Sequence, residues 1–326
     1  ANAISMEWLQ MLIAAIDDMG PRLLVPCDEM AIRLLFALVL EPPPDLPSAT
    51  RSQLRALIET SLGDPLFYQT SIDKTLLPPA AETLGIRVPP YAVADSIDEA
   101  AASAATLGYP VVLKRRFGFA GEGVAIVADP DDLVRQGSAL LSADQLDLAQ
   151  RLPQRMLVQA FIHGPYHSQA IAAWQGTPLA GFAWERQVAT LSCKGQTSVL
   201  RFIRSPETRD FTETLGKAFG ISGFCNVQFV LDDGGRAHLL EINRRIVTHM
   251  HMGERVDADL AVALVRQLRG LPPSPWVEPA AASGSSVAIF PREWLRNPGS
   301  PYLRDCPADV PWDEPELIRV MLAMRH

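Results

Sequence analysis

The chain has 326 residues, which is long enough for two or three domains or lobes with separate cores. Hydrophobic residues make up 48% and charged residues 20%, the composition of a globular protein, and no apolar run reaches the roughly 20 residues that span a bilayer. The formal net charge of -8 argues against a broad nucleic-acid-binding surface, although a local cluster of cations and backbone N–H groups still permits an anionic nucleotide to bind.

The amino-terminal part predicts two helices on either side of a strand. Residues 7–19 have the apolar spacing of an amphipathic helix, which Gly20 and the proline after it end. Residues 22–28 predict a short buried strand, and Asp28 is placed to cap a helix that runs to about residue 40. This order of elements predicts the remnant of an open parallel sheet.

Loops and helices then alternate. The proline-rich stretch 41–47 is predicted to be a loop, because proline cannot continue a helix or a central strand. Helices are predicted near 51–61 and after Asp73. An extended segment at 85–91 and an alanine-rich helix at 96–107 follow.

Residues 109–127 predict a strand that ends in a lysine, a glycine-rich loop and a second strand. Lys114 at the strand end can place its ammonium on phosphates, while a loop with Gly118, Gly121 and Gly123 lets backbone N–H groups approach the same oxygens. The alternative is a long hairpin loop with an exposed lysine. The pattern matches neither a Walker loop nor the dinucleotide Gly-x-Gly-x-x-Gly order.

A second lobe is predicted to begin after a helical stretch at 130–150. It opens with the strand 156–160, and strands follow at 168–174 and 178–190. Cations gather in the polar stretch 185–204, namely Arg186, Lys194, Arg201 and Arg204. A guanidinium there can pair with a carboxylate or a phosphate group. The alternative is that this stretch is a solvated face. At most one or two of the four cations are expected to take part in catalysis.

The stretch 224–245 predicts a hairpin around Gly234-Gly235. If these two glycines form the loop, Gln228 lies opposite Glu241, and Asn226 lies opposite Asn243. The other face is predicted to be core, with Val227, Phe229, Leu240 and Ile242. Oxygen-bearing side chains gathered on one face are typical ligands for Mg²⁺. The alternative is an ordinary amphipathic hairpin whose polar face meets solvent.

After the hairpin, His249 and His251 form an isolated His-x-His pair, which is a weak metal signal, and a loop that lines a substrate pocket is the better interpretation. A helix is predicted at 257–269. The tail from Leu271 contains Trp294, Tyr302 and Trp312, and it is predicted to fold back onto the body.

The four cysteines are far apart and form no Cys-x-x-Cys pair: Cys27, Cys193, Cys225 and Cys306. Free thiols in a reducing compartment are therefore expected, and zinc ligation is disfavoured. The amino terminus has no basic region before its apolar residues, so the protein is predicted to be cytoplasmic, with no membrane partner.

Three of these blocks together resemble the ATP-grasp superfamily, and most closely its carboxylate–amine ligase-like proteins. The blocks 109–127, 156–164 and 224–245 occur in that family's order, and the resemblance covers roughly residues 70 to 270. It implies an α/β and α+β ATP-grasp fold preceded by a partial pre-ATP-grasp domain. That domain normally begins ahead of Ala1, so an amino-terminal portion is expected to be missing.

The resemblance implies a role for each matching residue. Lys74, in Ser71–Thr75, and Lys114 would reach the nucleotide phosphates, although Lys74 precedes two prolines and also fits a surface lysine. The segment from Gln159 to Ile162 would bind adenine through its backbone, with Phe161 and Ile162 as apolar walls. Arg245 would contact phosphate.

Several positions depart from the family pattern. Gln159 or Ala160 stands where a hinge glutamate is usual, and Arg244 replaces a proline. His167 stands near the usual ribose-binding carboxylate, and a simple loop histidine fits it equally well. One carboxylate and two amides, Glu241, Gln228 and Asn243, replace the usual acidic metal ligands, which predicts weaker binding of Mg²⁺ or Mn²⁺.

The domains implied are a partial pre-ATP-grasp domain (1–72), an N-lobe with the glycine-rich loop (73–155), a C-lobe with the metal-binding hairpin (156–270) and a carboxyl-terminal extension (271–326). The function implied is ATP-dependent activation of a carboxylate as an acyl phosphate for attack by an amine, with release of ADP and phosphate. A small-molecule kinase and a catalytically silent ATP-binding module remain alternatives. The substrates and the oligomeric state, homodimer included, stay open.

Overall fold

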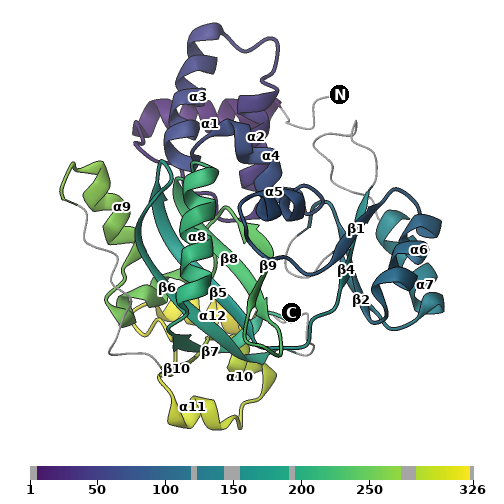
Figure 1. The fold of residues 1–326 in the computed structure, drawn as a ribbon. Helices are drawn as coiled ribbons and strands as arrows, with labels where there is room; N and C mark the ends of the chain where they lie inside the picture. Colours follow the sequence, from purple (N-terminus) through teal and green to yellow (C-terminus); the bar gives the residue numbers. More distant parts are fainter. Residues whose placement is uncertain (1–5, 119–122, 143–154, 191–194, 273–283, 324–326) are drawn as a thin grey trace.

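The computed structural model describes residues 6–118, 123–142, 155–190, 195–272 and 284–323. Helices at the amino terminus sit above a large sheet, a small sheet with its own helices lies to one side, and short helices at the carboxyl terminus lie below (Figure 1). Both sheets have antiparallel neighbours throughout. No described helix has the length and the hydropathy needed to cross a membrane.

The amino-terminal part is helical, with α1 (Met6–Met19), α2 (Glu29–Leu40), α3 (Ser48–Leu62), the 3-10 helix η1 (Pro65–Phe67) and α4 (Tyr68–Ile72). As predicted, the Asp28 side chain caps α2, accepting from the Ala31 N–H at 2.7 Å. The predicted strand at 22–28, and with it the parallel sheet, is wrong. No second strand lies beside this segment in the described chain, so its backbone has no ladder to join. Its Leu24 N–H donates to the Ser61 hydroxyl instead.

The first sheet has the order β1-β4-β2-β3, from β1 (Tyr91–Ala94), β4 (Met156–Ala160), β2 (Val111–Arg115) and β3 (Val124–Val127). Helices α6 (Ile97–Leu107) and α7 (Pro130–Ser142) share its apolar core, and α5 (Leu77–Thr83) starts with prolines in its first turn, where proline is tolerated. The prediction that the strand 156–160 opens the second lobe is wrong. It lies between β1 and β2, so the first lobe reaches Ala160.

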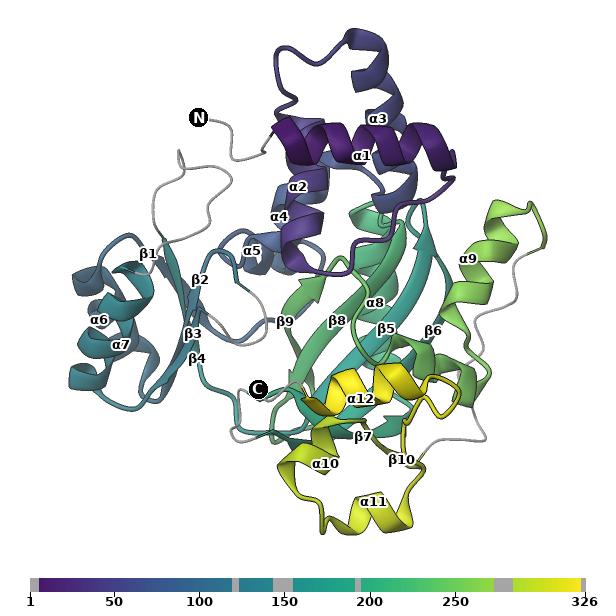
Figure 2. The same cartoon turned by 180° about the vertical axis from the view of Figure 1, so that it is seen from behind.

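The second sheet has the order β10-β7-β6-β5-β8-β9. Its strands are β10 (Ser286–Ala288), β7 (Thr197–Ile203), β6 (Thr177–Ala189), β5 (Tyr166–Trp174), β8 (Gly223–Leu231) and β9 (Ala237–Asn243). One face packs against α8 (Pro206–Ala218), and the other against the 3-10 helix η2 (Met250–Val256) and α9 (Leu260–Leu268). Seen from behind, this second face lies between α2 and the carboxyl-terminal helices (Figure 2).

The carboxyl-terminal segment folds back as expected, with α10 (Arg292–Arg296), α11 (Pro301–Asp305) and α12 (Pro315–Ala323). The residues that hold this segment against the body differ from the predicted aromatic residues. Trp294 is 50% exposed and Trp312 is 78% exposed, whereas Glu293 is fully buried and accepts a hydrogen bond from the Ser198 hydroxyl at 2.8 Å. Strand β10 adds itself to β7.

The predicted hairpin is present, and a β-bulge changes its register. Gln228 lies opposite Glu241 and Asn226 opposite Asn243, as counted from the sequence. Nearer the turn the pairing shifts by one residue, so that Phe229 faces Leu239. Leu239 therefore takes the core place predicted for Leu240, and Leu240 turns toward the space between the two sheets.

Candidate active site

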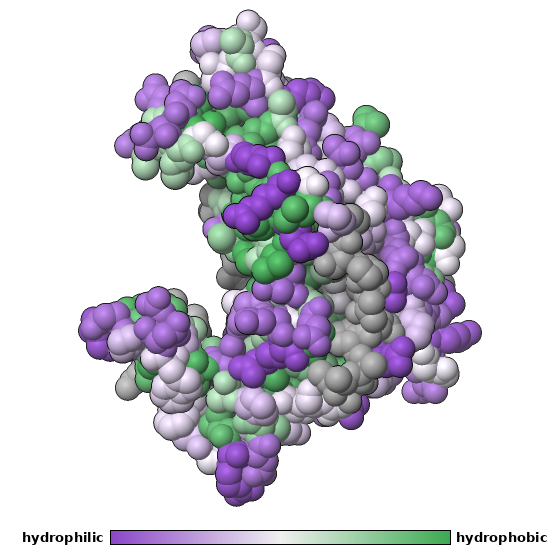
Figure 3. Space-filling model, turned by 90° about the vertical axis from the view of Figure 1, so that its left-hand side faces the viewer, coloured by the Kyte–Doolittle hydropathy of each residue, from purple (hydrophilic) through white to green (hydrophobic). Residues whose placement is uncertain are grey.

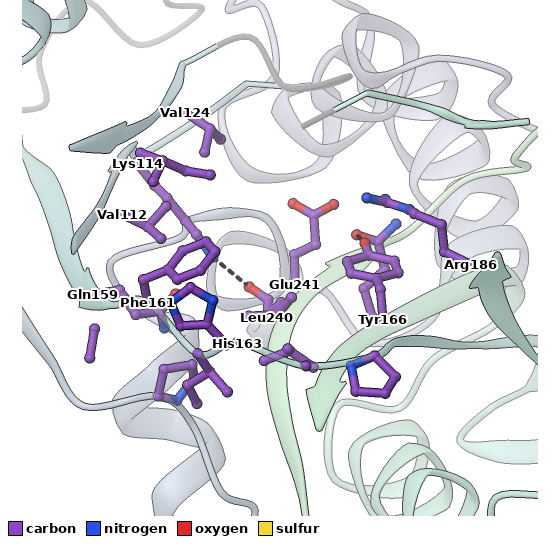
Figure 4. A pocket seen from close by; sticks show the side chains of 18 of the residues that line it. Val112, Lys114, Val124, Gln159, Phe161, His163, Tyr166, Arg186, Leu240 and Glu241 are labelled. Atoms are coloured by element: carbon purple, nitrogen blue, oxygen red, sulfur yellow. Dashed lines mark hydrogen bonds between the residues drawn. The ribbon is translucent and has the colours of Figure 1, made fainter. Parts of the chain in front are cut away.

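A cavity of about 500 Å³ lies between the two sheets. Its walls come from β2, β3 and β4 on one side and from β5, β6, β8 and β9 on the other. Lys114 and Gln159 lie on the first side, Tyr166 and Arg186 on the second, and the Glu241 carboxylate points into the space between them (Figure 4). The three sequence blocks singled out above therefore meet in one cavity.

The segment predicted to hold adenine forms one end of this cavity. Gln159 is buried, and Phe161 and Ile162 both line the space. The Phe161 ring packs edge-on against the His163 ring, with their centroids 4.6 Å apart. A flat apolar wall beside the edge of a strand's backbone is the environment that a purine ring needs.

Lys114 is a buried ammonium at one side of this cavity. Only 6% of the residue is exposed, and its Nζ donates to the Leu240 carbonyl at 3.5 Å. Burial lowers the Lys114 pKa to about 8, while Glu241 acts in the opposite direction. No ion pair joins Lys114 to a carboxylate among the residues that the structure describes. A polyanion in the cavity would supply the missing negative charge.

Lys74 also reaches the site and is not a surface lysine. Its Nζ donates to the Gly118 carbonyl at 2.8 Å and lies 3.9 Å from Glu241 Oε2. It thereby connects the start of the glycine-rich loop to β9. Gly123, at the other end of that loop, has φ +73°, and an added Cβ would lie 2.6 Å from Arg115 Nε. Gly121 lies outside the described residues.

The three predicted metal ligands come together at the polar end of the hairpin. Asn243 Nδ2 donates to Glu241 Oε1 at 3.3 Å, and the Tyr166 hydroxyl donates to Gln228 Oε1. One carboxylate and two amide oxygens fit Mg²⁺ that keeps much of its water and phosphate coordination. No cluster of three His, Cys, Asp or Glu residues suited to a metal occurs in the described chain.

Glu29 is a carboxylate at the site that no sequence pattern indicates. It comes from the first turn of α2, and its Oε2 lies 3.3 Å from Arg245 Nε. Burial raises its pKa, against the opposing effects of Lys74 and Arg245. Arg245 in turn donates to Asn243 Oδ1 at 3.4 Å. No sequence signal joins α2 to the hairpin, because only the tertiary fold brings them together.

The candidate cations of the stretch 185–204 separate onto two faces. Arg186 lines the cavity and stacks over the Tyr166 ring at 4.0 Å, whereas Arg204 is exposed. Arg201 lies on the opposite face of the sheet, where its Nη2 is 2.8 Å from Glu185 Oε2. Alternation of side chains along a strand causes this separation. Lys194 lies outside the described residues.

His167 is predicted to contact a ribose hydroxyl, and its place in the fold contradicts this. It is the neighbour of Tyr166 on β5 and therefore points to the other face, where its Nε2 lies 3.7 Å from Glu185 Oε2. Burial lowers its pKa, while Glu185 raises it. The residue with a side chain in the cavity is Tyr166.

A second cavity of about 390 Å³ shares four wall residues with the first: Tyr166, Arg186, Gln228 and Glu241. It extends over the open face of the large sheet toward α2 and α10. From the side, a deep hollow separates the part with the amino-terminal helices from the lower part of the molecule (Figure 3). Arg245, His249 and Arg292 line this cavity, and no sequence pattern indicates Arg292.

Comparison with known proteins agrees with this architecture. The family model for an ATP-grasp in the biosynthetic pathway with Ter operon matches residues 153–289, and the model for the ATP-binding domain of the carbamoyl-phosphate synthase L chain matches residues 73–171. Together they cover both sheets.

Curated relatives are similar over about half of the chain. A D-alanine–D-alanine ligase of Pseudomonas entomophila is 27% identical over 181 residues, which are 53% of this chain and 54% of that protein. A carbamoyl phosphate synthase large chain of Hyperthermus butylicus is 25% identical over 54% of this chain and 16% of its own length. The chain thus spans about half the length of the first relative and a much smaller share of the second.

Solved structures share the fold. The biotin carboxylase domain of the Hydrogenobacter thermophilus 2-oxoglutarate carboxylase, in complex with MgADP, ADP and bicarbonate, has a TM-score of 0.62 at 17% identity, over 85% of this chain and 60% of that one. Biotin carboxylase from Campylobacter jejuni, in a β-γ-ATP complex, has a TM-score of 0.63 at 17% identity, over 82% and 59%. The chain is therefore similar to ATP-grasp proteins and to the ligases among its curated relatives.

Proposed function

We propose that the protein is an ADP-forming ligase that activates a carboxylate with ATP for attack by an amine. The observation that carries this proposal is the pair of connected cavities, one with a buried lysine and an apolar hinge, the other with arginines. A nucleotide fits the first, and a small acidic substrate fits the second. Glu241 lies at their junction, where the two reactants would meet.

The proposed reaction has two steps, phosphoryl transfer to the carboxylate and attack by the amine. A carboxylate oxygen attacks the γ-phosphorus of ATP, the bond from that phosphorus to the β,γ-bridging oxygen breaks, and the bond electrons leave with ADP. The amine nitrogen then attacks the acyl carbon. The C–O bond to phosphate breaks, one amine proton is lost to the leaving phosphate, and an amide forms. Activation is necessary because the oxide of an unmodified carboxylate is too poor a leaving group.

The protein's part is positioning and charge stabilisation. Lys114 and Lys74 would hold phosphate oxygens, and Phe161 and Ile162 would enclose the purine. Arg186 borders both cavities and would face the transferred phosphoryl group. Arg245 is held by Glu29, so its guanidinium has a fixed position at the second cavity.

Glu241, Gln228 and Asn243 would hold Mg²⁺, and Mn²⁺ has the same preference for oxygen ligands. When bound, the metal would screen the charge on the phosphates. Asn243 already orients the Glu241 carboxylate through a hydrogen bond, and Tyr166 orients Gln228.

Trapping of the acyl phosphate tests the proposal. The protein is incubated with MgATP, hydroxylamine and pooled amino acids and other small carboxylic acids, and ADP and hydroxamate are measured together. A ligase gives both products in a ratio near one. ADP together with a stable phosphomonoester identifies a kinase, and nucleotide binding without ADP release identifies a silent module. Lys114→Met should abolish product, whereas the exposed Lys217→Met on α8 should not.

A further inference from the structure

The second cavity is bordered by residues with buried polar atoms that have no hydrogen-bond partner among the described residues. These atoms are Trp184 Nε1, Asn226 Nδ2 and both ring nitrogens of His249. His249 is 7% exposed, and its ring packs edge-on against Trp184 with the centroids 4.4 Å apart. An unpaired buried polar atom loses its hydrogen bonds to water, so folded proteins leave few of them without a functional reason.

Most of these unpaired groups are hydrogen-bond donors. Trp184 Nε1 and the Asn226 amide nitrogen donate only, and a neutral imidazole donates through one of its nitrogens. Burial lowers the His249 pKa to about 3, helped by Arg292 and Arg186, so the ring is neutral at physiological pH. A set rich in donors favours a ligand rich in acceptors.

Arg292 adds a positive charge to the same wall. Its Nη1 donates to the Thr197 carbonyl at 3.3 Å, and no ion pair joins it to a carboxylate in the part of the chain that the structure describes. Arg186 Nε donates to the hydroxyl of the same Thr197 at 3.2 Å. Two guanidinium groups therefore contact one residue at the start of β7, in a wall that also contains His249.

Contacts of its own helix, α10, fix the position of Arg292. Glu293 is fully buried and accepts from the Ser198 hydroxyl at 2.8 Å, and Arg296 Nε donates to it at 2.7 Å. These contacts join α10 to β7. A carboxyl-terminal segment that is far from the ATP-binding elements in sequence thus supplies one wall of the cavity.

This wall lies away from Glu241 and the other proposed metal ligands. Thr197 is on β7 and Glu241 is on β9, and β6, β5 and β8 lie between these strands. Four strand spacings of about 4.8 Å place them roughly 19 Å apart along the sheet. Arg292, which contacts Thr197, and Glu241 therefore line the second cavity from opposite sides.

We propose that Arg292 and His249 bind a carboxylate group of an organic substrate, and that this group is not the one that accepts the phosphoryl group. The proposal rests on the ligase function proposed above. Two kinds of substrate would supply such a carboxylate. One is a phosphoryl acceptor with a second acid group, and the other is an amino acid that supplies the amine. Arg292 is then a residue that determines specificity.

Calorimetric titration with defined probes tests the proposal. Succinate, glutarate, glutamate and alanine are titrated into protein saturated with MgADP, with propionate as the monoacid control. At least one diacid or amino acid should bind more tightly than propionate. Arg292→Ala should weaken this binding roughly 10- to 100-fold, and Arg292→Lys should restore part of it, because a charge-assisted hydrogen bond contributes about 1.5–3 kcal/mol. Binding of diacids without amino acids identifies the first kind of substrate, and the reverse identifies the second.

Three controls separate this proposal from folding and from the proposed function. Arg304→Ala removes an exposed arginine from the same carboxyl-terminal segment and should change nothing. His249→Ala should weaken the same probe, and every variant should still bind MgADP with the affinity of the unchanged protein. If MgADP binds but no probe does, or if Arg292→Ala binds the tightest probe equally well, the proposal is overturned. Failure of the unchanged protein to bind MgADP overturns the ligase function as well.

Discussion

Lys74 Nζ lies 3.9 Å from Glu241 Oε2, which joins a lysine at the end of the amino-terminal helices to the carboxylate at the polar end of the hairpin. The same ammonium holds the Gly118 carbonyl at 2.8 Å. Lys74 is therefore placed to fix the glycine-rich loop and to offset charge on phosphates. Lys74→Met should lower kcat for ADP release about 100-fold, the usual effect of losing one preorganised charge at a transition state. Unchanged kcat with normal folding would refute this role.

The buried ammonium of Lys114 makes nucleotide binding depend on pH. Its pKa is lowered to about 8, so free protein loses this charge as the pH rises through 8, whereas bound phosphates favour the charged form. We expect ATP affinity to fall between pH 7 and about 9.5, and ATP binding at pH 9 to take up a proton. Calorimetry in buffers of different ionisation enthalpy measures that uptake. Lys114→Arg does not titrate in this range, and it should remove both effects.

The lowered Lys114 pKa also predicts how the free energy of unfolding depends on pH. Below pH 8 the folded protein carries a buried ammonium at a cost, and this cost disappears as the pH rises from about 8 toward the ordinary lysine value of 10.5. Lys114→Met should therefore raise the free energy of unfolding more at pH 7 than at pH 10. Urea unfolding at the two pH values measures the difference, and a larger gain at pH 10 would contradict this account.

Arg244 holds the amino-terminal helices against the large sheet. It is 1% exposed, its Nη1 donates to the Ser71 hydroxyl at 3.1 Å, and its Nη2 donates to the Leu62 carbonyl. Arg244→Ala leaves these acceptors unpaired and opens a cavity, so we expect it to lower the free energy of unfolding by about 3 kcal/mol. Ser71→Ala, which removes one of the two contacts, should cost about 1 kcal/mol. Equal stability of all three proteins would show that this contact is dispensable.

Gly63 marks a second close contact between the same two parts. It has φ +93°, and an added Cβ would lie 1.9 Å from the Gly220 carbonyl oxygen. Gly20 also has a positive φ, +52°, but a Cβ added there would meet nothing within 4 Å. Gly63→Ala should therefore destabilise the protein by several kcal/mol more than Gly20→Ala, which carries only the cost of backbone strain, about 1–2 kcal/mol. Similar urea midpoints for the two variants would contradict the contact.

Periodicity and turn chemistry are sufficient to predict those features of the fold that depend on residues close together in the sequence. The helix capped by Asp28 and the strand that contains Lys114 follow directly from residue order. So does the pairing of Gln228 with Glu241. The β-bulge escapes prediction because a register shift depends on how the second strand packs. The same one-residue shift makes the turn one residue longer than the two-residue turn predicted.

Non-local features escape prediction. Residues 22–28 have the composition of a strand but find no partner strand in the described chain, and β4 joins the other lobe because sequence order does not reveal which sheet a strand enters. His167 and Arg201 have suitable chemistry, but the phase of each strand turns them to the far face. Glu29 and Arg292 reach the cavities from distant segments, so tertiary structure alone reveals them.

Titration of MgATP into the protein tests the central claim most directly, because all the proposed chemistry requires a nucleotide between Lys114 and Glu241. We expect saturable binding at one site, weakened about 100-fold or more in Lys114→Met and unchanged in Lys217→Met. Equal affinity in all three proteins, or no binding by the unchanged chain, would contradict it.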